Sequence, residues 1–365
     1  MKLNWLYLQT SAPEGHSGFC LEEGFYVAFE RLIEKGILSE LVIVMETTRD
    51  EVIKVNDKVS ILLTTDINID DKLHEGDIVL CRGGFRSWYP LLNRINDRKI
   101  PLLFYRAASN RHFWTFWNIV LEDIDPRIAE GAFVDKDRMY LPIVKPAHPR
   151  IFYPDETVTQ DYDVCIGASH VHSKKGQIRA VRGLIEAQKQ LGIKFKCVMP
   201  GRPPKRSILE EIQQVAIDGG LDIDYPGMVD RVTLATIFNR SKMYLHLATC
   251  GQNDRGILEA MACGVPSMIG YPKFHPPYMV DNDSLVWLAD DADDPTRTGG
   301  NIAAMYKTVQ SLGKDYRITI RQYYLAKNGM REHLLPQFEK LFKYLKENPV
   351  MDRPKLWEYY GARRA

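Results

Sequence analysis

Residues 244–269 read YLHLATCGQNDRGILEAMACGVPSMI, and this stretch contains the alternation that decides the fold. The apolar run at 243–247 is followed by turn residues, which predicts a buried strand. Good helix formers then occupy 256–263, and Gly264 ends them. The apolar run at 265–269 begins the next strand. A strand, a loop, a helix and a second strand are the unit of a parallel α/β sheet, and the amino end of the helix offers backbone N–H groups to an anion.

One carboxylate, Glu259, lies inside this otherwise apolar helix. A carboxylate in that position either occupies a solvated face or hydrogen-bonds a polar group such as a sugar hydroxyl. The stretch resembles the donor-binding signature of the retaining family-four glycosyltransferases of the GT-B fold. In that family the carboxylate of this helix binds the ribose of a sugar nucleotide, so the resemblance implies that role for Glu259.

The donor signature departs from the family pattern at two places. The family has a second glutamate eight residues before the first, in a turn that touches the donor sugar, and this chain has Gly251 there. The family also holds the donor diphosphate with an arginine and a lysine in one loop. Lys175 and Gly176 match the lysine and its glycine, but Ala168 and Ser169 stand where the arginine is expected. A neutral side chain replaces a guanidinium poorly on phosphate.

The resemblance assigns a donor site to the second half of the chain. Lys175, Arg255 and the amino end of the 256–263 helix would stabilise the departing diphosphate. A turn after a predicted strand at 221–225 would read the nucleotide base. The donor-binding residues that this implies are Gly167, Lys175, Gly176, Met228, Val229, Gly251, Gln252, Asn253, Asp254, Arg255, Gly256 and Glu259.

The first loop of the chain supplies further candidates. It follows a predicted strand at 4–8 and precedes a predicted helix from about 19 to 36. In GT-B enzymes the corresponding loop faces the interdomain cleft and approaches the donor phosphates and the acceptor. The resemblance therefore assigns Gly15 and Gly18 to the donor and His16 to the acceptor side. The alternative for His16 is an exposed loop histidine.

Two more strand ends carry polar side chains, at the edge where parallel sheets bind ligands. Arg82 ends one strand and is assigned to the acceptor side. Arg106 ends the next and stands where the family has a histidine near the donor sugar, which makes it a catalytic candidate with Lys175 and Arg255. His112 is a further acceptor-side candidate, although the aromatic run at 112–117 also suits a helix that packs on the sheet.

An acidic run at 290–294 also needs an interpretation, because a D-x-D after a strand is the metal site of the other glycosyltransferase fold, GT-A. Here the run lies beyond the whole donor signature. Asp294 followed by Pro295 has the pattern of a helix N-cap with proline in the first position. His170 and His172 have no partner ligands nearby in the sequence. We therefore expect no metal and no other cofactor.

The composition is that of an ordinary soluble globular protein. Of 365 residues, 45% are hydrophobic and 26% charged, and the length suits two domains. A formal net charge of +1 gives no electrostatic reason to expect a nucleic acid or a membrane as partner. No apolar run is long enough to span a bilayer, and the N-terminus lacks a signal-peptide pattern. We therefore expect a cytoplasmic protein, whose six cysteines, without any CxxC pair, are buried thiols.

Strands and helices alternate on both sides of a proline-rich run at 145–154, which predicts an α/β protein with two Rossmann-like domains. The resemblance implies that the domains, 1–150 on the acceptor side and 151–330 on the donor side, face a cleft. It also implies that a C-terminal helix and tail, 331–365, cross back to the N-terminal domain. The strands expected in the N-terminal domain after the first are 41–45, 59–63, 77–81, 101–105, 119–121 and 139–143.

The function that these expectations support is transfer of a hexose-like sugar from a nucleotide-sugar donor to a glycan or glycoconjugate acceptor. The resemblance implies retention of the anomeric configuration and no metal. Two alternatives stay open. A nucleotide-sugar 2-epimerase would need several carboxylates in the cleft, and the sequence has no such cluster. A non-catalytic GT-B domain that binds a nucleotide or a glycan is favoured by Gly251 and by the missing arginine.

Overall fold

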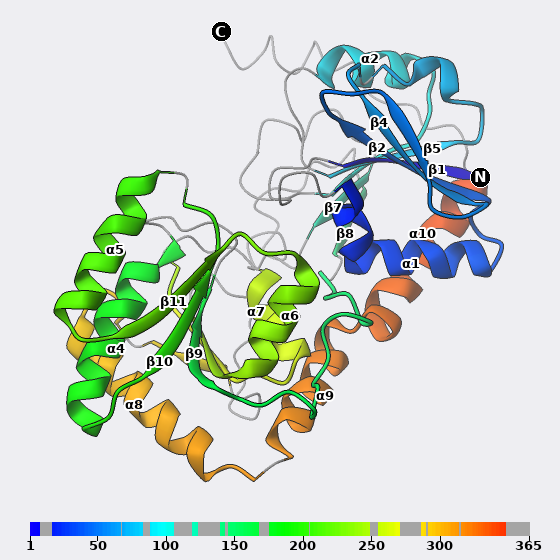
Figure 1. Cartoon of the computed structure of the whole chain (residues 1–365). Helices are drawn as coiled ribbons and strands as arrows, with labels where there is room; N and C mark the ends of the chain where they lie inside the picture. Colours follow the sequence, from blue (N-terminus) through cyan, green and yellow to red (C-terminus); the bar gives the residue numbers. More distant parts are fainter. Residues whose placement is uncertain are drawn as a thin grey trace, which may run out of the picture. The chain divides into compact units, whose positions relative to one another are not determined.

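The computed structural model in Figure 1 describes residues 1–7, 17–66, 68–82, 88–105, 119–122, 139–142, 145–167, 175–203, 205–248, 255–270, 286–289, 291–313 and 315–347. These residues form two compact units. The first contains 1–7, 25–142 and 331–347 of that set, and the second contains 17–24 and 145–330. The division predicted from the sequence placed 17–24 with the first domain, whereas the structure groups this segment with the second unit.

The first unit is built on an eight-stranded sheet with the order β3-β4-β2-β1-β5-β6-β7-β8. Its neighbouring strands are parallel, except that β3 is antiparallel to β4. The strand order reverses between β1 and β5, which makes their carboxyl ends the topological switch point of this sheet. The strands are β1 Lys2–Tyr7, β2 Glu40–Glu46, β3 Glu51–Lys54, β4 Val59–Thr64, β5 Ile78–Arg82, β6 Leu102–Tyr105, β7 Ile119–Glu122 and β8 Met139–Pro142.

The C-terminal helix α10, Leu335–Glu347, belongs to the first unit and packs on α1, Gly24–Glu34. The contact is aromatic: the rings of Phe29 and Phe338 stack with centroids 5.4 Å apart, and Phe342 lies edge-on to Phe338 at 5.8 Å. These rings are buried. The predicted return of the C-terminal helix to the N-terminal domain is thereby confirmed. Among the described residues, the other helical elements of this unit are η2 Asp70–Lys72, α2 Tyr89–Asp97 and the π-helix η8 Met330–Leu334 from Arg331 onward.

The second unit is built on a six-stranded parallel sheet with the order β11-β10-β9-β12-β13-β14. The chain starts in the middle at β9, moves outward to β10 and β11, and then crosses to β12 on the other side of β9. The switch point therefore lies between the carboxyl ends of β9 and β12. The strands are β9 Tyr162–Ile166, β10 Lys196–Pro200, β11 Asp222–Gly227, β12 Ser241–His246, β13 Ser267–Ile269 and β14 Val286–Leu288.

Two apolar clusters cover the two faces of this sheet, as the strand period of two requires. Val164 of β9 and Leu245 of β12 pack with α4, α5 and α8 on one face. Cys165 and Tyr244, the next residue on β9 and the preceding one on β12, pack with α6, α7 and α9 on the other (Figure 1). The helical elements of the unit are η1 Ser17–Glu22, α4 Gln177–Leu191, α5 Arg206–Asp218, α6 Arg231–Arg240, α7 Arg255–Ala262, α8 Pro295–Ser311 and α9 Tyr316–Asn328.

The helix predicted from about residue 19 to 36 is wrong in its first part. The structure has the 3-10 helix η1 up to Glu22 and starts α1 at Gly24. A Cβ atom at Gly24 would lie 2.3 Å from the carbonyl oxygen of Pro146, so only glycine fits where the backbone passes this proline. Because Pro146 is far from Gly24 in the sequence, and because apolar residues continue at helical spacing through this region, the sequence gives no sign that the helix begins only at Gly24.

The predicted N-cap at Asp294 is confirmed, because its carboxylate accepts hydrogen bonds from the N–H groups of Thr296 and Arg297 at the start of α8. Five cysteines lie within the described ranges, and all five are buried thiols without a disulfide. Burial raises the pKa of Cys263 to about 12. Within the described part of the chain, every helix is too short or too polar to cross a lipid bilayer.

Candidate functional site

The switch point of the second sheet is held together by hydrogen bonds between the ends of β9 and β12. The N–H of Gly167 donates to the Leu245 carbonyl at 3.2 Å. His246 Nδ1 lies 3.1 Å from the Gly167 carbonyl oxygen, and since a carbonyl only accepts, Nδ1 carries the proton. A Cβ at Gly167 would lie 2.1 Å from the Tyr244 ring, so this predicted site residue is a glycine because an aromatic ring occupies the space.

Lys175 and Gly176 directly precede α4. Gly176 is the N-cap of this helix and has a φ of 79°, in the left-handed region that favours glycine. A Cβ there would lie 1.8 Å from the carbonyl oxygen of Leu247. The amino end of α4 is thus packed directly against the chain that leaves β12. Lys175 is half-buried and directly precedes Gly176 at this junction.

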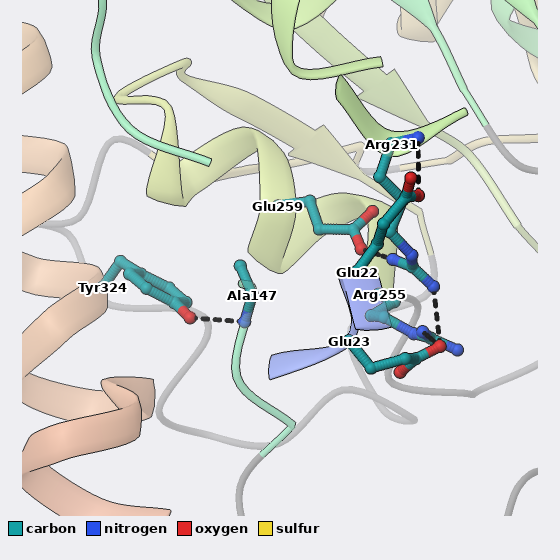
Figure 2. A network of polar contacts seen from close by, with 7 residues as sticks. All are labelled: Glu22, Glu23, Ala147, Arg231, Arg255, Glu259 and Tyr324. Carbon is teal, nitrogen blue, oxygen red and sulfur yellow. Dashed lines mark hydrogen bonds and ion pairs between the residues drawn. The ribbon is translucent and has the colours of Figure 1, made fainter. Parts of the chain in front are cut away.

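The predicted ribose ligand Glu259 is buried, with 3% of its surface exposed, and it lies one helical turn after Arg255 on α7. A solvated face, one of the two options open from the sequence, is therefore excluded. Its Oε1 accepts a hydrogen bond from Arg231 Nη1, the first residue of α6 (Figure 2). The second guanidinium nitrogen of Arg231 donates to Glu23 Oε1 at 2.8 Å. Arg255 Nη1 also donates to Glu23 Oε1.

Figure 2 shows the resulting chain of alternating charges, Arg255–Glu23–Arg231–Glu259, which we call the charge chain. All four members belong to the second unit. Two guanidinium groups face two carboxylates, so the formal charges cancel where a single buried charge would be costly. The carboxylate of Glu22 accepts from the backbone N–H of Arg231 at 3.2 Å and thereby adds an anion at the positive end of α6.

Sequence reasoning missed Glu23 and Arg231. They are 208 positions apart, and each directly follows an acidic residue, Glu22 or Asp230, so neither local spacing nor composition distinguishes them from surface charges. The signal that was present is positional. Arg231 opens the helix after the Gly227-Met228-Val229 turn, which belongs to the predicted donor site, whereas Glu23 lies inside the helix predicted from about residue 19 and had no such signal.

Helix α9 fixes the carboxyl end of α7. Arg321 donates to the Ala262 carbonyl oxygen at 2.5 Å and to that of Phe152 at 2.8 Å. Arg317 donates to the carbonyl oxygen of Cys263 at 2.8 Å. These cations lie where the negative end of the α7 dipole is, so they stabilise the helix that presents Arg255 and Glu259.

The two residues predicted to touch the base follow β11 directly. Gly227 ends the strand with a φ of 74°, and Met228 and Val229 are half-buried after it. The strand lies two places from β9 in the sheet order, on the same edge as the start of α4. The role of Met228 and Val229 in base binding stays a prediction.

In the first unit, Arg82 ends β5 at the switch point of the eight-stranded sheet. Its guanidinium lies 5.0 Å from the centroid of the Tyr7 ring, and its neighbour in the register of β6 is Tyr105. Arg82 is buried, with 9% exposed. The assignment of Arg82 to the acceptor side stays a prediction.

Of the residues predicted in the first loop, Gly18 lies within the described ranges, in η1 of the second unit. Within the described ranges, no group of three or more His, Cys, Asp or Glu side chains is arranged to hold a metal ion. The predicted residues outside the ranges are Gly15, His16, Arg106, His112, Gly251, Gln252, Asn253 and Asp254.

The structure resembles solved glycosyltransferases, although no family model and no curated protein matches the sequence. A glycosyltransferase from Rickettsia africae ESF-5 superposes with a TM-score of 0.64 at 12% identity, over 95% of this chain and 99% of that one. HepE of Anabaena, in complex with UDP and glucose, superposes with 0.64 at 11% identity, over 95% and 100%.

The pneumococcal O-GlcNAc transferase GtfA, in complex with UDP and GlcNAc, gives a TM-score of 0.58 at 14% identity. The alignment covers 76% of this chain and 58% of GtfA, so the chain spans little more than half of that protein. Together with the two parallel sheets and their switch points, these likenesses establish one conclusion about architecture: the chain has the GT-B glycosyltransferase fold.

Proposed function

We propose that the protein is a glycosyltransferase that moves a sugar from a nucleoside diphosphate sugar to a carbohydrate or glycoconjugate acceptor. The observation that carries the proposal is the place of Glu259. It lies buried on the helix that follows β12, and β12 ends at the switch point, where parallel sheets bind ligands. UDP in the complexes of HepE and GtfA supports a uridine nucleotide as the first donor to test.

The residues around the switch point suit the parts of such a donor. Lys175 and the amino ends of α4 and α7 offer a cation and backbone N–H groups to the diphosphate. Arg255 adds a second cation, and Glu259 accepts from the ribose hydroxyls. When the bond to the sugar breaks, negative charge builds on the diphosphate, and fixed cations lower the free energy of that transition state.

We further propose retention of the anomeric configuration, which the resemblance to the retaining family implies. We also propose transfer without a metal ion, because Lys175 and Arg255 supply the positive charge that a metal supplies elsewhere. Proton NMR of the product formed from an α-linked donor tests the first point, since an α-linked product is expected. Assay in excess EDTA tests the second, since turnover is expected to persist.

The experiment for the donor site is titration calorimetry with UDP. Lys175→Ala and Glu259→Gln are each expected to weaken binding about 10-fold to 100-fold, as loss of a charged hydrogen bond does. Lys189→Ala is the matched control on α4, because Lys189 is exposed and pairs only with Glu186 of its own helix among the described contacts. Unchanged binding in both site variants would refute the proposed site.

A second candidate function, a GT-B domain that binds a nucleotide sugar without transferring it, is favoured by Gly251 in place of the second glutamate. Turnover separates the two. Release of UDP from the bound donor in the presence of an acceptor panel supports the transferase. Tight binding with no release across the panel supports the non-catalytic domain.

A further inference from the structure

Arg231 holds two carboxylates at once, and they come from segments that are far apart in the sequence. Nη1 donates to Glu259 on α7, and Nη2 donates to Glu23, which follows η1. The three side chains are at most 8% exposed. A guanidinium is planar and its N–H groups point in fixed directions, so it sets the orientation of both carboxylates together.

The position of Arg231 is itself fixed from several sides. It is the first residue of α6, whose N-cap Asp230 accepts from the N–H of Thr233 at 2.7 Å. Its own N–H donates to Glu22 at 3.2 Å, and its guanidinium lies 4.8 Å from the centroid of the Phe19 ring. The arginine is therefore anchored at its backbone, its charged end and one face.

The same oxygen of Glu23 that accepts from Arg231 also accepts from Arg255. Arg255 is one helical turn from Glu259 on α7, and its side chain is 25% exposed while the other three members are buried. The charge chain thus links Glu259, proposed for the ribose, to Arg255, proposed for the diphosphate, through Arg231 and the carboxylate of Glu23.

We propose that Arg231 and Glu23 are positioning residues of the nucleotide site, which hold the Glu259 carboxylate in the orientation that ribose binding needs. The proposal rests on the proposed function, in which Glu259 binds the ribose. Neither residue needs to touch the nucleotide. Their effect is on the selectivity for the ribose hydroxyls, because that selectivity depends on where the Glu259 oxygens lie.

The test is calorimetric titration of the purified protein with UDP and with 2′,3′-dideoxy-UDP. The wild type is expected to prefer UDP about tenfold or more, as expected for hydrogen bonds to a charged group, and Glu259→Gln is expected to abolish the preference. Arg231→Lys keeps the charge but loses the two-sided fork, and the preference is expected to fall below about threefold with little change for dideoxy-UDP. Arg240→Lys is the matched control on α6, since Arg240 pairs with Asp161 at a partly exposed site; its preference is expected to equal that of the wild type.

Glu23→Gln provides a second variant with the same measurement, which decides the question should Arg231→Lys fail to fold. It keeps an oxygen that can accept from Arg231 but removes the negative charge that Arg231 and Arg255 share, so it weakens the hold on Arg231 and is expected to reduce the preference for UDP. If the wild type and Glu259→Gln behave as expected while both new variants keep the full preference, the inference is overturned and the proposed function stands. Equal weakening of UDP and dideoxy-UDP would also overturn it, because that result indicates a structural role alone. A wild type without preference for UDP would overturn both.

Discussion

The hydroxyl of Tyr324 on α9 accepts a hydrogen bond from the backbone N–H of Ala147 at 2.7 Å, and both groups are buried (Figure 2). The bond ties the proline-rich connector, where the chain returns to the second unit, to helix α9, 177 residues later in the chain. The Tyr324 hydroxyl thus accepts from a backbone N–H in a segment between two prolines, where no neighbouring strand or helix among the described residues supplies a backbone acceptor.

Tyr324→Phe is therefore expected to destabilise the protein by about 1–3 kcal/mol, since it leaves a buried N–H without an acceptor. Urea unfolding followed by tryptophan fluorescence measures the change. Tyr153→Phe is the control, because its ring is 44% exposed, and it is expected to stay within about 0.5 kcal/mol of the wild type. Equal effects of the two variants would contradict the role given to Tyr324.

Gly176→Ala and Gly192→Ala make a matched pair at the two ends of α4. Both glycines have left-handed φ angles, 79° and 66°, which cost an alanine about 1–2 kcal/mol. A Cβ at Gly192 meets nothing within 4 Å, whereas one at Gly176 would lie 1.8 Å from the Leu247 carbonyl oxygen. Thermal unfolding is expected to show the larger loss for Gly176→Ala by a clear margin. Similar losses would mean that the backbone of α4 moves away freely.

Asp294→Ala is expected to cost about 1 kcal/mol, because it removes the side-chain acceptor for two N–H groups at the start of α8. Asp315 is also an N-cap residue, of α9, but its side chain makes no capping hydrogen bond. Asp315→Ala is therefore expected to change the free energy of unfolding by less than about 0.5 kcal/mol. The difference in free energy of unfolding between these two variants, measured by urea unfolding, tests the contribution of the Asp294 cap.

His148 predicts how stability depends on pH. Burial, with the nearby charges of Arg150 and Arg231, lowers the pKa of His148 from 6.5 to about 4. Its Nδ1 accepts from the N–H of Arg150 at 3.3 Å, which requires the neutral ring. Between pH 6.5 and about 4 the unfolded chain binds more protons at this site than the folded chain does. Stability is thus fully present above pH 6.5 and is lost as the pH falls to about 4, by up to about 1.4 kcal/mol per unit.

The control for this pH dependence is His148→Asn, whose side-chain oxygen accepts a hydrogen bond without titrating. Urea unfolding at a series of values from pH 7.5 to 4.5 is expected to show a shallower decline for this variant than for the wild type. Parallel curves would assign the acid lability to other groups.

The fold was largely predictable from the sequence, because the strands that form the two sheet centres are apolar runs bounded by turn residues. The runs at 4–8 and 243–247 correspond to β1 and β12, and the predicted GT-B architecture is confirmed. β3 escaped prediction because Glu51–Lys54 is a short edge strand with exposed and half-buried residues and therefore shows little apolar periodicity.

The candidate site was predictable only where it depends on neighbouring residues in the sequence. Lys175, Gly176 and Glu259 were predicted from local motifs that resemble the donor signature, and the structure places them at the chain segments that border one switch point. Their roles in donor binding stay predictions. The pairing of Arg231 with Glu23 depends on tertiary structure, and a charged residue carries no local mark of a partner 208 positions away. Periodicity likewise gave no sign that Pro146 interrupts the first helix at Gly24.

Each compact unit includes one segment that is separated from the rest of that unit in the sequence by residues of the other unit. Residues 17–24 belong to the second unit, and 331–347 belong to the first. During synthesis the contacts of Phe29 on α1 with Phe338 and Phe342 therefore cannot form until almost the whole described chain has left the ribosome. The second unit, in contrast, has all of its segments by residue 330. A genetic dissection that cuts the chain once, anywhere between the units, would deprive at least one half of a piece of its own core.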